Sequence, residues 1–197
     1  MRTRSLVAVA VIAPLLAGVG TAHAAKKPPA KKPVCKLVTD SANDGTGTGT
    51  GQTGPNDPNL DIVSADIATN AATLTAVWRL SAVDGSNSSS PTGRSYTMTF
   101  TVNDKTTTVR AIISPAGNVW QGGDGTGFVD TKLKEIHLSV PLAKLVIPVK
   151  ANDKVGSLGA SAWRWVGNQS ISLGLVDSAA SVATYVAGWP SCVKVGA

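Results

Sequence analysis

The chain has 197 residues, which is enough for one domain of ordinary size together with a targeting segment and a linker. It carries 18 Lys and Arg against 12 Asp and Glu, but six of the basic residues precede Val34, so the charges of the remainder cancel. This distribution argues against a nucleic-acid-binding domain, which would carry its positive charge on the fold.

The first 24 residues have the features of a secretory signal peptide, because Arg2 and Arg4 precede an apolar run from Leu6 to Ala17. Ala22-His23-Ala24 supplies the small residues of a cleavage site, which places the mature N-terminus at Ala25. The apolar run is too short to cross a bilayer, and no later run is long enough, so we expect no transmembrane segment in the mature chain. The protein is therefore predicted to be extracellular, either secreted or held at the cell surface.

Residues 25–33 contain three prolines and four lysines, a composition that predicts an extended linker. Two roles remain open for it: a solvated leader, or a segment attracted to an anionic polymer of the cell envelope. Residues 34–197 are predicted to form a single domain. Cys35 and Cys192 are the only cysteines, and in an exported protein they predict one disulfide that joins the two ends of this domain.

Apolar and polar residues alternate at period two through the body of the chain, which predicts half-buried antiparallel strands. Breaks are expected at Asn70-Ala71-Ala72 and at Asn103-Asp104, and Pro141–Leu145 predicts one helical turn. Many short strands closed by a disulfide predict an all-β fold, an antiparallel, jelly-roll-like β-sandwich. The side chains expected to face the core are, in chain order, Val63, Ala65, Ile67; Leu74, Ala76, Trp78, Leu80; Tyr96, Met98, Phe100, Val102; Val109, Ala111, Ile113; and Ile136, Leu138, Val140.

The segment Asp61–Ile67, followed after a turn by Leu74–Leu80, resembles the opening hairpin of a superfamily of secreted sandwich domains. That superfamily includes the family 9 carbohydrate-binding modules, the DOMON domains and the C-terminal module of glucodextranase. The strand from Lys154 to Trp165 falls in the expected order, and the ending from Val176 to Cys192 resembles small exported actinobacterial proteins. The resemblance covers most of the domain and implies a β-sandwich. Members bind sugars, haem or calcium, or have no known ligand.

No catalytic residue is predicted. His23 would leave with the signal peptide, and His137 alternates with Ile136 and Leu138, so it should point to solvent. With both cysteines paired, nucleophile systems of the Ser-His or Cys-His type have no support. A glycosidase would need two placed carboxylates, whereas the Asp residues here are concentrated in loops. We therefore expect the protein not to be an enzyme.

The loop around Gly45–Gly54 is the best candidate for ion binding. Asp40, Asp44 and Asp61 flank it, and hard carboxylate oxygens on flexible loops suit Ca²⁺. The three residues are accordingly predicted as calcium ligands. The alternative is a mobile loop whose Asp and Asn side chains cap turns.

Trp163 and Trp165 share one face of the strand that ends near Val166, and Arg164 shares the other face with Leu158, Ala160 and Ala162. If the Ala-rich face is core, both indoles face outward, where sugars could stack on them. If the Trp face is core, Arg164 is simply exposed.

The sequence as a whole predicts an exported, non-catalytic binding module for a glycan, a polysaccharide or another cell-wall polymer. The alternative is a structural or interaction protein of the cell surface with no small-molecule ligand.

Overall fold

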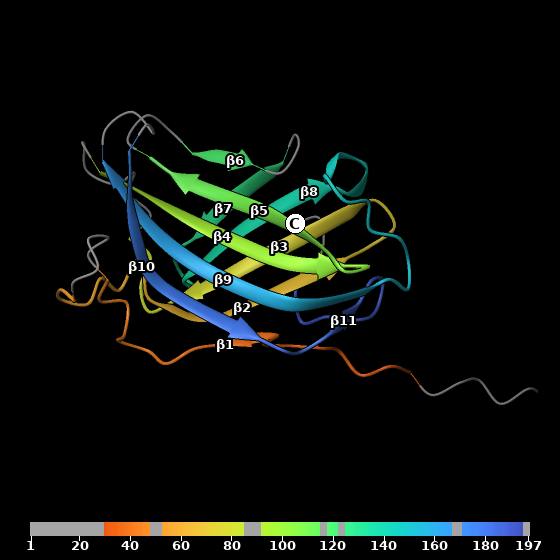
Figure 1. Ribbon diagram of the computed structural model, residues 1–197. Coiled ribbons are helices and arrows are strands. Elements are labelled where there is room, and N and C mark those ends of the chain that lie inside the picture. Colours follow the sequence, from red (N-terminus) through yellow and green to blue (C-terminus); the bar gives the residue numbers. More distant parts are fainter. Residues whose placement is uncertain are drawn as a thin grey trace, which may run out of the picture. The chain divides into compact units, whose positions relative to one another are not determined.

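The alternating apolar residues form strands that pair into two antiparallel sheets in the computed structural model (Figure 1). The structure describes residues 30–47, 53–84, 92–114, 118–121, 125–166 and 171–194; the predicted signal peptide, 1–24, and the first part of the predicted linker lie outside them. The strands are β1 Val38–Thr39, β2 Ile62–Thr69, β3 Thr73–Leu80, β4 Thr92–Val102, β5 Lys105–Ile113, β6 Val119–Gln121, β7 Thr126–Asp130, β8 Glu135–Pro141, β9 Lys154–Val166, β10 Ile171–Ser181 and β11 Tyr185–Val186, with a 3-10 turn, η1, at Leu142–Lys144.

The five-stranded sheet has the order β1-β2-β3-β8-β7, and the six-stranded sheet has the order β10-β9-β4-β5-β6, with β11 paired to β9. The predicted turns occur where the sequence places them. The side chain of Asn70 accepts hydrogen bonds from the backbone of Ala72 and Thr73 at 2.8 and 2.7 Å, which closes the β2–β3 hairpin. Asn103 and Asp104 have φ of 49° and 62°, the left-handed pair that a two-residue hairpin requires.

The hydrophobic core lies between the two sheets and confirms the predicted inward faces with one exception. Trp78 is fully buried, and its indole nitrogen donates to the Thr97 carbonyl at 3.3 Å. Val63 was expected in the core, but it is only half-buried, because β2 carries a bulge between Ile62 and Ser64. The extra residue shifts the alternation, so Ile62 takes the inward position.

The predicted disulfide is confirmed: Cys35 and Cys192 are bonded across a sequence separation of 157 residues, with their Cα atoms 5.2 Å apart. The Val34 carbonyl also accepts from the Cys192 backbone at 3.2 Å. The antiparallel β-sandwich with joined ends is thus confirmed. Part of the predicted linker contacts the domain, since the Lys31 ammonium lies 4.0 Å from the centroid of the Trp189 ring, a cation–π geometry.

The residues that the structure describes include no helix long and apolar enough to pass through a membrane.

Candidate functional site

The outer face of the six-stranded sheet carries one described tryptophan. On β9, Leu158, Ala160 and Ala162 are buried against the other sheet, so the Ala-rich face is the core face. Trp163 therefore lies on the opposite, outer face, where it is half-buried, and it does not belong to the described core. Its indole nitrogen donates to the Ser161 hydroxyl at 2.9 Å, which fixes the orientation of the ring.

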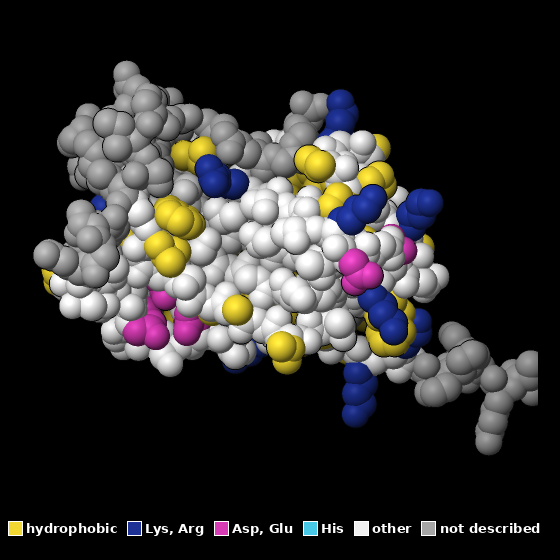
Figure 2. Space-filling model, in the orientation of Figure 1, with side chains coloured by type: hydrophobic (Ala, Val, Ile, Leu, Met, Phe, Trp, Pro, Cys, Tyr) yellow, Lys and Arg dark blue, Asp and Glu magenta, His cyan; other side chains and the backbone are white. Residues whose placement is uncertain are grey.

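The neighbours of Trp163 across the sheet are small or apolar. Ser95 of β4 and Leu175 of β10 lie directly opposite it, and Leu175 is 40% exposed. In Figure 2 the middle of this side of the molecule is largely free of charged side chains, while acidic side chains gather at one end (lower left). Trp165, the other predicted platform residue, belongs to β9, but its side chain lies outside the described residues.

Arg164 lies on the inner side of β9 and pairs with a loop carboxylate. Its guanidinium donates to Asp57 Oδ2 at 2.6 Å. This ion pair partly neutralises the Asp57 carboxylate. Arg94, on β4, pairs in the same way with Asp84 at 2.8 Å. Each basic residue thus holds a loop against the strands.

Two glycines let the segment after β1 pack against β2 and the edge strand β10. A Cβ on Gly45 would lie 2.9 Å from the Cα of Asp61, and one on Gly47 would lie 2.8 Å from the Cα of Val176. The Gly47 backbone also donates to the Val176 carbonyl at 3.0 Å. A side chain at either position would collide with backbone. Glycine at both positions therefore allows the segment to lie against Asp61 and against β10, close to Asp177.

This packing creates an acidic cluster, which we define as Asp40, Asp44 and Asp177. One carboxylate oxygen of each lies within 4.8 Å of the others. Burial, and then the charges of Asp40 and Asp44, raise the pKa of Asp177 to about 6. Burial is also the main cause of a raised pKa at Asp40, followed by the charges of Asp44 and Asp61. The raised pKa values of Asp40 and Asp177 thus come from burial and from neighbouring carboxylates.

Two of the three predicted calcium ligands, Asp40 and Asp44, belong to the acidic cluster. The third, Asp61, lies beneath them and is fully buried. Its Oδ2 accepts from the Asn43 backbone at 2.8 Å and from the Ser81 hydroxyl.

Sequence reasoning missed Asp177, because strict alternation puts it on the same outer face as the exposed Leu175. A bulge between these residues reverses the alternation, and Asp177 pairs with the inward-facing Ala162 instead. Its Oδ2 accepts from the Ile62 backbone at 2.6 Å. The only signal in the sequence was a lone acidic residue in an otherwise uncharged strand.

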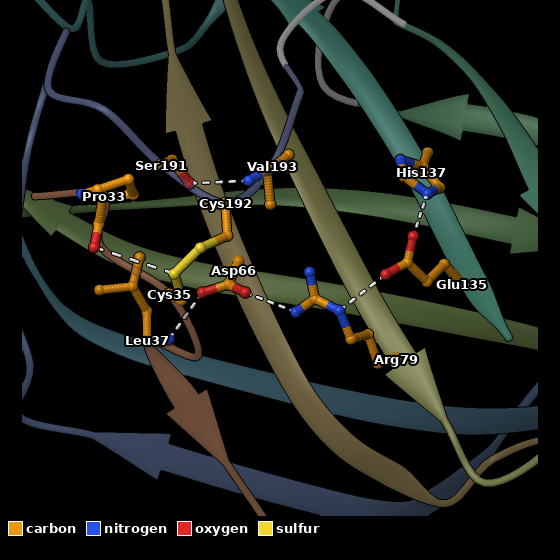
Figure 3. A network of polar contacts seen from close by, with 10 residues as sticks. All are labelled: Pro33, Cys35, Leu37, Asp66, Arg79, Glu135, His137, Ser191, Cys192 and Val193. Atoms are coloured by element: carbon orange, nitrogen blue, oxygen red, sulfur yellow. Dashed lines mark hydrogen bonds and ion pairs between the residues drawn. A yellow bond between two sulfur atoms is a disulfide. The ribbon is translucent and has the colours of Figure 1, made fainter. Parts of the chain in front are cut away.

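A second polar group crosses the outer face of the five-stranded sheet (Figure 3). Arg79 contacts Asp66 at 2.5 Å and Glu135 at 2.7 Å, and the second oxygen of Glu135 lies 2.8 Å from His137 Nε2. Asp66 is fully buried and also accepts from the Leu37 backbone at 2.7 Å. Because one guanidinium binds both carboxylates, the arrangement ties β2, β3 and β8 together beside the disulfide.

The expectation that His137 points to solvent is only half correct. It lies on the outer face of β8, as alternation requires, but its side chain is only 13% exposed. The Phe128 ring of β7 stacks on it, with centroids 4.3 Å apart and planes 10° apart. Packing by a neighbouring strand, which alternation does not reveal, removes the imidazole from solvent.

Comparisons with protein-family models, with curated proteins and with solved structures give no match. The geometry of this chain is therefore the basis for a functional assignment.

Proposed function

We propose that this protein is an extracellular, non-catalytic binding module that recognises a glycan, such as a polysaccharide or another cell-wall polymer, through the outer face of its six-stranded sheet. The observation that supports this proposal is the position of Trp163. Its ring lies outside the described core, half-buried, on a face whose nearest cross-strand neighbours are Ser95 and Leu175.

The chemistry of this surface suits a sugar better than a charged partner. A sugar ring offers a flat apolar C–H face that can stack on an indole, with hydroxyl groups at its rim. Ser161 uses its hydroxyl to hold the indole nitrogen, so the ring is pre-oriented and loses little freedom on binding. On the same outer face, the exposed hydroxyl groups of Thr99 on β4 and Thr108 on β5, 3.3 Å apart, supply donors and acceptors for the rim of a ligand.

The test compares Trp163→Ala with the native protein in binding to insoluble cellulose, chitin and purified peptidoglycan, and to an array of soluble glycans. Loss of one stacking contact of about 1–2 kcal/mol should weaken binding about 5- to 30-fold. Trp163→Phe should retain part of the affinity, because a smaller aromatic face remains. The matched control is Leu133→Ala, which removes an exposed apolar side chain, 64% exposed, from the β7–β8 turn and should leave binding unchanged.

Stability has to be measured beside binding. Trp163→Ala should cost clearly less than the about 3–5 kcal/mol expected for truncation of a large buried aromatic such as Trp78. Absence of binding to every glycan tested, or undiminished binding by a folded Trp163→Ala variant, would refute the proposal. It would then favour a surface protein that acts only through contacts with other macromolecules.

A further inference from the structure

Three carboxylates from two distant segments meet where the loop after β1 packs on β10. Among the described residues, no Lys or Arg forms an ion pair with the acidic cluster of Asp40, Asp44 and Asp177. Negative charges this close repel one another, and a bound divalent cation would offset that repulsion. We propose that the acidic cluster is a calcium-binding site.

A second observation, independent of the cluster, is a set of buried oxygen atoms without donors. Asp61 Oδ1, Asp40 Oδ2 and Asn56 Oδ1 are all inaccessible to solvent, and none accepts a hydrogen bond from a residue that the structure describes. Among these three residues, Asp61 is the one that is fully buried, so water cannot supply the missing hydrogen bond to its Oδ1. Leaving such an acceptor unsatisfied costs about 1–3 kcal/mol, and more for a charged group.

The Asp61 carboxylate faces the loop that carries the cluster. Its other oxygen accepts from the backbone of Asn43, which lies between Asp40 and Asp44, and its charge contributes to the raised pKa of Asp40. Asn56 reaches the same place, since its Oδ1 would lie 3.2 Å from a Cβ on Gly45. One buried oxygen without a donor, Asp40 Oδ2, thus belongs to a residue of the acidic cluster itself, and Asp61 and Asn56 carry two more beside the loop that bears Asp44.

The donor set selects the ion. All of the side chains concerned offer oxygen only, which disfavours Zn²⁺, whose structural sites use Cys and His. Most of the oxygens come from an irregular loop, with one from a bulged strand, and Ca²⁺ accepts such irregular geometry with six to eight ligands at about 2.3–2.6 Å. Mg²⁺ demands a near-ideal octahedron at shorter distances. The site binds the loop to β10 and does not depend on glycan binding by the outer face.

The experiment uses the purified protein after exhaustive dialysis against EDTA, with its metal content measured before and after dialysis. Calcium chloride is then titrated in while thermal unfolding and heat of binding are recorded, and magnesium chloride is titrated in parallel. Calcium should raise the melting temperature progressively with its concentration, because it binds only the folded arrangement of ligands. Magnesium at the same concentrations should produce a markedly smaller rise.

Two variants make the test specific. Asp44 is exposed, so Asp44→Asn should leave the metal-free protein folded and weaken calcium binding about tenfold or more. Asp104→Asn, at an exposed position of the β4–β5 turn, removes the same charge elsewhere and should bind calcium as the native protein does. No calcium-dependent rise in melting temperature, an equal response to magnesium, or an unchanged response in Asp44→Asn would overturn the proposal. None of these results bears on Trp163.

Discussion

Removal of the Cys35–Cys192 disulfide should cost a large part of the stability of this domain. The bond closes a loop defined by a sequence separation of 157 residues. In the chain-entropy model, a loop of that size restricts the unfolded chain enough to stabilise the fold by about 5 kcal/mol. For a domain of this size, that corresponds to a fall in melting temperature of about 10–20 °C.

The assay is equilibrium unfolding in urea of the native protein and of the double variant Cys35→Ala/Cys192→Ala, each with and without reducing agent. Reduction should lower the midpoint of the native protein to that of the variant and should not affect the variant. The dependence on urea should steepen when the bond is absent, because the unfolded chain then exposes more surface. A loss below about 1 kcal/mol would refute the entropic reasoning, and a titratable thiol in the native protein would refute the bond itself.

Two further predictions concern buried charge. Arg79→Met should destabilise the domain by about 3–5 kcal/mol in urea unfolding, because it leaves the fully buried Asp66 carboxylate without its cation. Arg79→Lys should recover part of this loss. A destabilisation below about 1 kcal/mol in Arg79→Met would contradict a structural role for the ion pair. Asp177 has a pKa of about 6 against an ordinary value of 3.8, so between these values the folded state binds a proton that the unfolded state has lost. Metal-free protein should therefore lose stability as pH rises from about 4 to above 6, and Asp177→Asn should remove most of that loss; unfolding midpoints that stay level or rise over this range would contradict the assignment.

Much of the fold could be predicted from the sequence because its determinants are local. Alternation at period two identified the strands and their inward faces, and Trp78, Tyr96 and Phe100 lie in the core as expected. Asn103 and Asp104 marked a hairpin because few residues accept left-handed backbone. With only two cysteines in the chain, a single intramolecular pairing was available, and it forms.

The candidate sites depended on tertiary structure to a greater degree. The sequence placed Trp163 opposite an Ala-rich face, but only the pairing of the two sheets decided which face is core. Asp40 and Asp44 stood out as loop carboxylates, whereas Asp177 joined them because of a bulge and of contacts between segments far apart, such as its hydrogen bond to Ile62, 115 residues away. Period-two alternation is a property of neighbouring residues. A bulge reverses it without a distinct sequence signal, and the burial of a charge is determined by the strands and loops that pack against it.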